Sequence, residues 1–176
     1  AFLQHKFAAI CMHPDEVACK ELWMKAFGDD EQFADSFIMR YYSRRRMLTA
    51  EAEGRMAAML HLLPFRTELG RTTYIYGVAT DPAFRGRGLA SQLMREAMRL
   101  IAERGDDAAF LIPTPGKEWL REFYGRFGFA GDVPARFVSA DRFDFGTGDA
   151  AADRAMVWRR DSSVPLPEQL TASWRS

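Results

Sequence analysis

The residues with the clearest chemical potential lie in the stretch DPAFRGRGLASQLM, which spans residues 81–94. Its two glycines allow consecutive backbone N–H groups to converge on one point. The N-terminus of a following helix adds about half a positive charge. Arg85 and Arg87 add two full charges and forked donors that suit phosphate. The pattern therefore predicts an anion site, most simply for a phosphate or a pyrophosphate.

Two common phosphate-binding motifs do not match this stretch. A Walker A loop requires GxxxxGK followed by Ser or Thr, and the chain has no such sequence. The Rossmann fingerprint fails at its third glycine, where Ser91 stands, and no acidic residue ends the next apolar segment, AAFLIP (108–113). An ordinary strand-to-helix connection with surface arginines is the structural alternative to an anion site.

The elements that must position the loop are predicted from hydrophobic periodicity. RTTYIYGVAT (71–80) is rich in β-branched and aromatic residues, which indicates a central strand. GLASQLMREAMRLIAERG (88–105) has the strongest helical spacing of apolar residues. Gly77, inside the strand, indicates either a bulge or a packing contact. The other expected elements are strands at 6–12, within 46–65 (a pair that ends at Pro64), and at 108–113, 135–146 and 154–161, and helices at 13–27, 29–42 and 116–129.

The order of these elements predicts an α/β (α+β) fold with a mixed, partly antiparallel sheet and helices on both faces. The chain has 176 residues, of which 48% are hydrophobic, so we expect one domain over residues 1–176. Residues 161–176 are predicted to form a polar tail or arm.

Four large aromatic side chains are predicted to lie in the core because of their helical spacing. For two of them, Phe33 and Phe37, lining an acceptor pocket is the alternative. The four residues are Trp23, Phe33, Phe37 and Trp119.

Composition argues against several classes of function. The formal net charge is +0, which disfavours a nucleic-acid-binding domain in spite of the run SRRR (43–46). The chain has no apolar run of membrane-spanning length and no signal-peptide pattern, so we expect a cytoplasmic protein without a membrane partner. Cys11 and Cys19 fit a reducing compartment and form no zinc-type spacing with histidine, so no metal is expected.

A second motif adds a family resemblance. RGRGLA (85–90) matches the pattern R/Q-x-x-G-x-G/A, and FYGRFGF (123–129) matches Y-x-x-x-G-F, with one predicted helix and one predicted strand between them. In this order the two motifs resemble those of the GNAT superfamily of N-acetyltransferases. The stretch 112–129 is nearest to the N-terminal acetyltransferase part of Eis-like proteins. Lys117 and Leu120 stand where many members of the superfamily carry Asn and Ala.

The resemblance implies a strongly twisted GNAT-type sheet and acetyl-CoA as the acyl-donor cosubstrate. The pantetheine arm would pair with the backbone at the end of the central strand, and a backbone N–H near Val78 would polarise the thioester carbonyl. The backbone amides of the glycine-arginine loop would hold the pyrophosphate. The implied cofactor-binding residues are Val78, Ala79, Thr80, Arg85, Gly86, Arg87, Gly88, Leu89 and Ala90.

The resemblance also implies a catalytic residue. Tyr124 matches the tyrosine that donates a proton to the departing thiolate of coenzyme A, and the unperturbed pKa of tyrosine, about 10, keeps the hydroxyl protonated at neutral pH. No general base is assigned: Glu51, His61 and Asp81 are candidates, and so is a water chain that ends at a backbone carbonyl.

The reaction implied is direct transfer of the acetyl group to a primary amine of an unidentified small-molecule or peptide acceptor. The alternative is a catalytically idle GNAT fold that serves as an acetyl-CoA sensor or a protein-interaction module. Because late strands in this fold often pair across a dimer, the resemblance also implies a homodimer. No nucleic-acid partner is expected.

Overall fold

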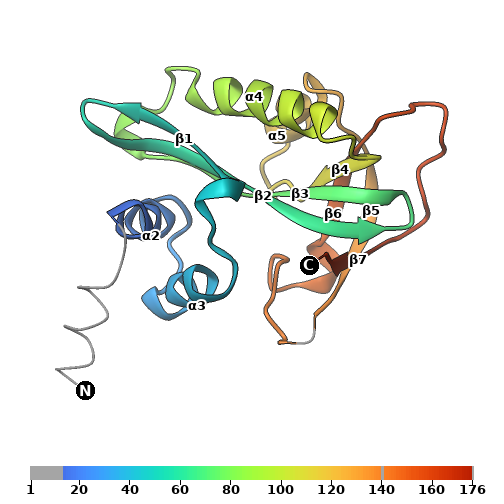
Figure 1. Ribbon diagram of the computed structural model, residues 1–176, viewed down its shortest axis with the longest axis horizontal. Helices are drawn as coiled ribbons and strands as arrows, with labels where there is room; N and C mark the ends of the chain where they lie inside the picture. The colour runs from blue at the N-terminus through green and yellow to red at the C-terminus, as the bar shows by residue number, and fades with distance from the viewer. Residues whose placement is uncertain (1–13, 140, 176) are drawn as a thin grey trace. The chain divides into compact units, whose positions relative to one another are not determined.

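The computed structural model describes residues 14–139 and 141–175 (Figure 1). The strand predicted at 6–12, together with Cys11, lies outside these residues. In chain order the elements are α2 (Pro14–Phe27), α3 (Glu31–Tyr41), η1 (Arg44–Arg46), β1 (Met47–Ala52), β2 (Arg55–Thr67), β3 (Gly70–Thr80), η2 (Pro82–Phe84), α4 (Leu89–Glu103), β4 (Ala108–Leu111), α5 (Trp119–Gly125), β5 (Ala130–Val138), η3 (Ala150–Ala152), β6 (Arg154–Arg159) and β7 (Leu170–Trp174).

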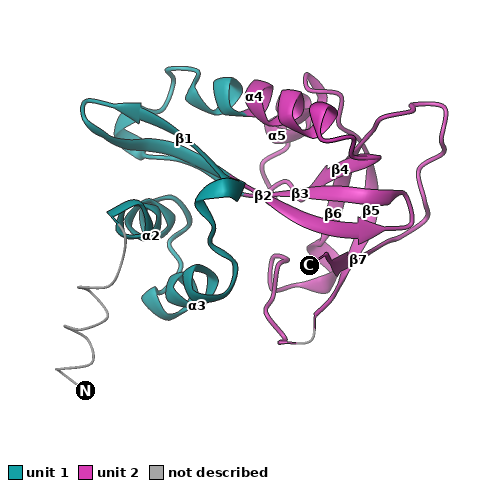
Figure 2. Ribbon diagram, in the orientation of Figure 1, with its two compact units in different colours: residues 1–60, 77–93 teal, residues 61–76, 94–176 magenta. Residues whose placement is uncertain are grey.

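The chain forms two compact units, which are shown in different colours in Figure 2. Unit 1 comprises the residues up to Leu60 and the segment Gly77–Leu93, and unit 2 comprises His61–Tyr76 and the residues from Met94 onward. Strands β2 and β3 and helix α4 each contribute residues to both units. The boundary between the two units therefore passes through these three elements. The expectation of one domain over residues 1–176 stays a prediction.

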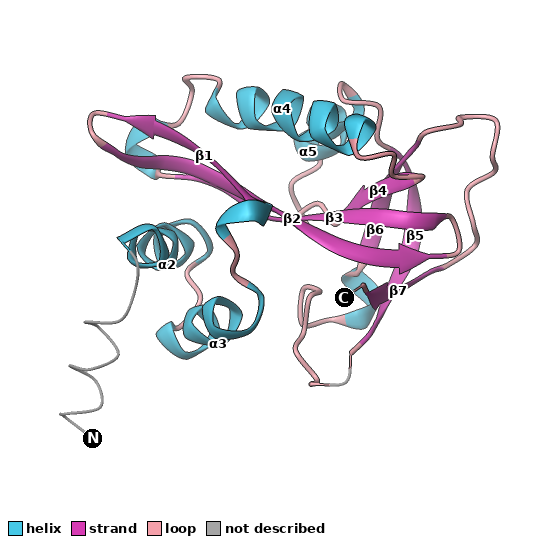
Figure 3. Cartoon of the chain, in the orientation of Figure 1, coloured by secondary structure: helices cyan, strands magenta, loops and turns pink. Residues whose placement is uncertain are grey.

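The strands form one sheet in the order β1-β2-β3-β4-β6-β5-β7, and β2 also pairs with β7 (Figure 3). This additional pairing closes six of the strands into a ring and leaves β1 outside it, beside β2. The β3–β4 and β5–β7 pairs are parallel, whereas the β4–β6, β5–β6 and β2–β7 pairs are antiparallel. The predicted mixed, partly antiparallel sheet is confirmed.

Aromatic side chains fill the core of unit 2. Phe65, which is 1% exposed, lies at the centre of this cluster. Its ring contacts five others at centroid distances from 5.3 to 6.4 Å, and all five pairs are edge to face, a geometry that aromatic pairs prefer. These are the rings of Tyr74, Phe110, Phe137, Phe145 and Trp174.

The helices of unit 1 begin and end where local chemistry predicts. Pro14 opens α2, and Gly28, at φ +65°, follows its last residue and donates its amide to the carbonyl of Met24 at 3.0 Å. Asp30 caps α3, because its carboxylate accepts from the amide of Phe33 at 2.7 Å. Ring stacking joins the two helices through Trp23 and Phe37, whose centroids are 4.7 Å apart.

Four expectations for individual elements are wrong. The strand expected at 135–146 is β5, which spans Ala130–Val138. Strand β2 does not end at Pro64 but continues to Thr67. Trp119 is 63% exposed instead of buried, because α5 has seven residues and begins at Trp119, so the periodicity expected over residues 116–129 does not apply. The tail predicted at 161–176 contains strand β7, whose Leu170 and Ala172 are both 0% exposed and pack inward.

No helix among residues 14–139 and 141–175 combines the length and the hydrophobicity that crossing a membrane requires.

Candidate active site

Asp81 shapes the start of the glycine-arginine loop in unit 1. Its amide donates to the carbonyl of Ala57 at 2.8 Å, and its carboxylate accepts from the amide of Ala83 at 2.9 Å. Lys25 forms an ion pair with the same carboxylate at 3.4 Å. The hydrogen bond from Ala83, assisted by the charge of Lys25, lowers the pKa of Asp81. This carboxylate caps η2, and its lowered pKa makes it a weaker base than an ordinary aspartate.

The two loop glycines are required by backbone conformation and not by lack of space. Gly86 has φ +80° and Gly88 has φ +75°, in the left-handed region that residues with a Cβ atom adopt at a cost. A Cβ atom built on either residue would have no neighbour within 4 Å. The glycines therefore turn the backbone while leaving open space beside it.

The loop leaves a series of backbone donors without acceptors. The first intrahelical bond of α4 runs from the amide of Gln92 to the carbonyl of Gly88, at 3.0 Å. In the described part of the chain, the amides of Arg85–Ala90 donate to no protein acceptor. Arg85 and Arg87 are both exposed. The structure thus brings together, within unit 1, the loop amides and the two charges that the sequence predicted.

Arg55 is a further cation near this loop that sequence reasoning missed. The guanidinium carbon of Arg55 lies 4.8 Å from the centroid of the Phe84 ring, and that of Arg87 lies 4.9 Å from the same centroid. Glu53 is 3.9 Å from Arg87, which is a long ion pair. In the sequence, Arg55 directly follows the Glu53–Gly54 turn. This position indicates that Arg55 lies near the loop only when the pairing of the strands is known.

The end of β3 departs from regular strand geometry where the sequence indicated either a bulge or a packing contact. Gly77 has φ +63°, whereas regular strand residues have negative φ. Ala79 is buried, and Val78 and Thr80 are half-buried. Pairing of β3 with β4 covers Thr72–Tyr74, six residues short of the end of β3.

Tyr124 belongs to unit 2 and lies in α5. Its side chain is 7% exposed, and burial raises the pKa of its hydroxyl to about 12. Its carbonyl accepts from the amides of Phe127 at 3.0 Å and Phe129 at 3.4 Å, which fixes the turn that leads into β5. The hydroxyl has no hydrogen-bond partner in residues 14–139 and 141–175.

A pocket of about 210 Å³ lies in unit 2 at the loop that connects β4 to α5. Lys117, at one of the two positions where this chain departs from the GNAT pattern, lines it. Two further cations on its wall, Arg121 and Arg154, both pair with Asp132 at 3.0 Å. The lining residues are Pro113, Thr114, Pro115, Gly116, Lys117, Glu118, Arg121, Ala152 and Arg154.

The two other candidate bases lie in different elements. Glu51 is exposed on β1 in unit 1, whereas His61 is 1% exposed on β2 in unit 2. Burial raises the pKa of the Cys19 thiol to about 12, so this thiol is not activated as a nucleophile. Within the described ranges, no group of three or more His, Cys, Asp and Glu side chains is arranged to hold a metal ion.

Comparison with known families and structures gives consistent matches. The family model described as "Acetyltransferase (GNAT) domain" matches residues 13–131. The structure is similar to that of YhbS, a GNAT family N-acetyltransferase from Escherichia coli solved in complex with CoA, with a TM-score of 0.63, 17% identity, and coverage of 93% of this chain and 86% of that chain. Comparison with the curated proteins gave no match.

Two further structures show the same fold. A GNAT family acetyltransferase from Brucella melitensis, solved with acetyl-CoA, has a TM-score of 0.58 and 16% identity, and the match covers 94% of this chain and 93% of that one. Eis1 from Mycobacterium abscessus has a TM-score of 0.54 and 16% identity, over 68% of this chain and 30% of that one.

Proposed function

Because the chain belongs to the GNAT family of acetyltransferases, we propose that it moves an acetyl group from acetyl-CoA directly to the primary amine of a small-molecule or peptide acceptor. The observation that carries the proposal is the loop after β3. In the described part of the chain its amides over Arg85–Ala90 have no protein acceptor, and this stretch contains two exposed arginines. Such a loop suits the pyrophosphate of coenzyme A.

Relatives of known structure support the choice of donor. YhbS was solved with CoA, and the Brucella protein was solved with acetyl-CoA. In this chain the irregular backbone at Gly77 and the partly exposed Val78 and Thr80 would pair with the amide groups of the pantetheine arm. Arg55, near Phe84 and Arg87, would add positive charge on the phosphate side.

In the proposed reaction the neutral amine nitrogen attacks the thioester carbonyl carbon. The carbon–sulfur bond then breaks, and the amine loses one proton to a base or to water. Tyr124 would donate a hydrogen bond, and then a proton, to the departing sulfur. Its pKa of about 12 keeps the hydroxyl protonated at neutral pH, so the proton that converts the departing thiolate to the thiol of coenzyme A is available at Tyr124.

The first experiment combines acetyl-CoA calorimetry with a thiol-release assay on the same preparation, with and without a panel of amines. We expect saturable binding and amine-stimulated release of thiol. Binding without release for any amine would favour the alternative role of an acetyl-CoA sensor or interaction module. Absence of binding would overturn the assignment of the loop.

Substitution of Tyr124 by Phe separates binding from catalysis. We expect kcat to fall about 100-fold, the low end for loss of a positioned acid, while the Kd for acetyl-CoA stays unchanged. Trp119→Phe, on the exposed surface of the same helix, is the matched control and should leave both constants unchanged. A Tyr124→Phe enzyme as fast as the unmodified chain would remove Tyr124 from the mechanism.

A further inference from the structure

Three arginines of unit 2 lie on, or directly after, three neighbouring strands and share one face of the sheet. Strand β7 pairs with β2 with Phe65 opposite Trp174, and β2 is followed along the sheet by β3. The Phe65 ring contacts the rings of both Tyr74 and Trp174 on the inner face. Because strand side chains alternate between faces, residues an odd number of positions from these lie on the outer face. This rule defines the arginine row: Arg66 of β2, Arg71 of β3, and Arg175, which directly follows β7.

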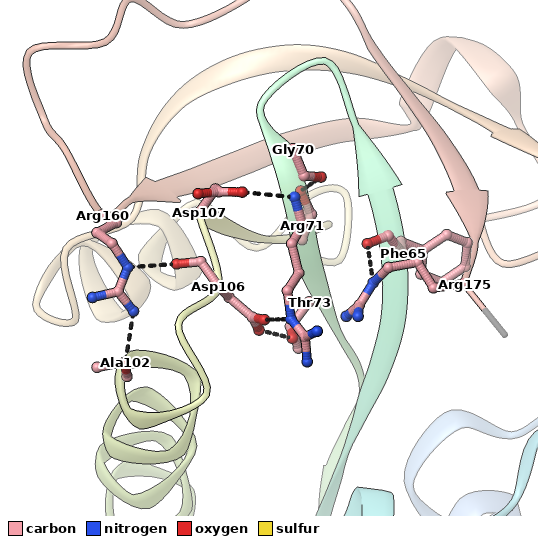
Figure 4. A network of polar contacts seen from close by, with 10 residues as sticks. Phe65, Gly70, Arg71, Thr73, Ala102, Asp106, Asp107, Arg160 and Arg175 are labelled. Carbon is pink, nitrogen blue, oxygen red and sulfur yellow. Dashed lines mark hydrogen bonds and ion pairs between the residues drawn. The ribbon is translucent and has the colours of Figure 1, made fainter.

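The contacts of the arginine row leave most of its donors unused. Arg71 Nε pairs with Asp106 Oδ1 at 2.7 Å, and the Thr73 hydroxyl binds the other oxygen of this carboxylate, which is 1% exposed (Figure 4). Arg175 Nε donates to the carbonyl of Phe65 at 2.8 Å. In the described part of the chain, the terminal nitrogens of Arg175 have no partner. Among the described residues, the Arg66 side chain likewise has no hydrogen-bond or ion-pair partner.

Two further acids near the row bind backbone amides and not these guanidinium groups. Glu68 accepts from the amide of Thr171 at 2.8 and 3.1 Å. Asp107 accepts from the amide of Arg71 at 2.9 Å. A fourth arginine, Arg160, donates to the carbonyl of Asp106 at 2.8 Å. Of the acids named here, only Asp106 forms an ion pair with the row, and it neutralises one of three charges.

The three positive charges are crowded. The charges of Arg71 and Arg66 both act on the guanidinium group of Arg175. Burial lowers the pKa of Arg175, the charges of Arg71 and Arg66 lower it further, and Asp106 alone acts in the opposite direction. Like charges on adjacent strands destabilise a sheet unless an anion lies between them.

We propose that the arginine row, Arg66, Arg71 and Arg175, is a binding site for a phosphate group. Neighbouring strands are about 4.8 Å apart, so guanidinium groups on three of them can reach one tetrahedral anion. A carboxylate is satisfied by a single guanidinium fork, whereas a phosphate offers three or more acceptor oxygens. The partial exposure of all three side chains leaves the site open to a soluble ligand.

This site is separate from the one proposed for coenzyme A. Arg71 is the second residue of β3, whereas the segment proposed to bind pantetheine is at the other end of that strand. The inference therefore does not rest on the proposed function, and it would hold for a protein that bound no coenzyme.

The test is calorimetric titration with inorganic phosphate in the presence of saturating CoA, which keeps the loop at Arg85–Ala90 occupied. We expect saturable binding. Arg66→Gln and Arg175→Gln should each raise the phosphate Kd about tenfold, as expected for loss of a charge-assisted hydrogen bond. Arg142→Gln, an exposed arginine of unit 2 outside the row, should leave the Kd unchanged. Proton-nitrogen spectra of each variant establish that it is folded.

A second arm replaces inorganic phosphate by methyl phosphate. Equal binding of the two would indicate that the ligand is a phosphate monoester, and tighter binding of inorganic phosphate would indicate the free anion; both results support the site. Absence of saturable phosphate binding by the unmodified chain would overturn the proposal. Equal phosphate Kd values for the unmodified chain and a folded Arg66→Gln, Arg175→Gln double variant would also overturn it.

Discussion

At the scale of single residues, the left-handed glycines have two different roles. Gly88 has open space around it, whereas a Cβ atom on Gly70, at φ +105°, would lie 2.4 Å from Asp107 Oδ2. Asp107 occupies that space because its carboxylate binds the amide of Arg71. Gly88 allows the loop backbone to adopt a left-handed conformation, whereas Gly70 leaves room for the carboxylate of Asp107.

Substitution of Gly88 by Ala tests the loop. We expect the Kd for acetyl-CoA to rise about tenfold, because a left-handed alanine costs about 1–2 kcal/mol and the loop relieves this strain by turning its amides away. The matched control is Gly105→Ala, with φ +76° and equally open space, at the far end of α4. The assignment fails if both variants bind acetyl-CoA as tightly as the unmodified chain.

Substitution of Gly70 by Ala tests the close approach. We expect it to lower the free energy of unfolding by more than Gly54→Ala does, because Gly54, at φ +76°, has no neighbour within 4 Å and reports the backbone cost alone. Urea denaturation of both variants gives the comparison. Equal losses would show that Asp107 moves aside freely.

At the scale of elements, β7 shows what a short strand contributes when it closes a sheet. It has five residues, yet it pairs with both β5 and β2. Leu170 and Ala172 are fully buried, and Trp174 joins the aromatic core.

Leu170→Ala should lower the free energy of unfolding by about 2–4 kcal/mol, the usual range for a buried leucine. Val164→Ala, at a position 40% exposed in the segment before β7, should change it by less than about 0.5 kcal/mol. Thermal or urea unfolding measures both. A small loss for Leu170→Ala would mean that β7 contributes little to the stability of unit 2.

At the scale of the whole molecule, buried tyrosines couple stability to alkaline pH. Burial raises the pKa of Tyr124 and of Tyr42 to about 12, and raises that of Tyr74 well above its ordinary value. In the unfolded chain each hydroxyl titrates near its ordinary value of about 10. Each tyrosine therefore contributes fully to the free energy of unfolding below about pH 10. This contribution is lost as the pH rises toward the pKa of the hydroxyl in the folded state.

We expect the free energy of unfolding to fall steeply between about pH 10 and pH 12, with Tyr124 alone accounting for about 2–3 kcal/mol. Urea denaturation at intervals across this range measures the slope. Tyr124→Phe should reduce the slope, because phenylalanine does not titrate. A flat profile would contradict the assigned burial of these hydroxyls in the folded state.

Periodicity and turn chemistry predicted most of the fold, and the motifs predicted the loop. The helix of Leu89–Glu103 and the loop before it were recognisable because their signals are contiguous in the chain. Strand β7 was missed because its five residues follow a polar, proline-containing stretch and gain their burial only by pairing with distant strands. The arginine row was missed for the same reason, since its members come together only through the β2–β7 pairing.

That pairing also has a kinetic consequence. The bond from Arg175 to the carbonyl of Phe65 joins residues 110 positions apart, and such contacts form late because long loops must close first. Until β7 docks, β2 and β5 each present an unpaired edge able to capture a strand of another chain. Folding of this protein is therefore expected to be slow for its size and sensitive to concentration. Before β7 pairs with β2, β-pairing between different chains competes with the correct pairing within one chain.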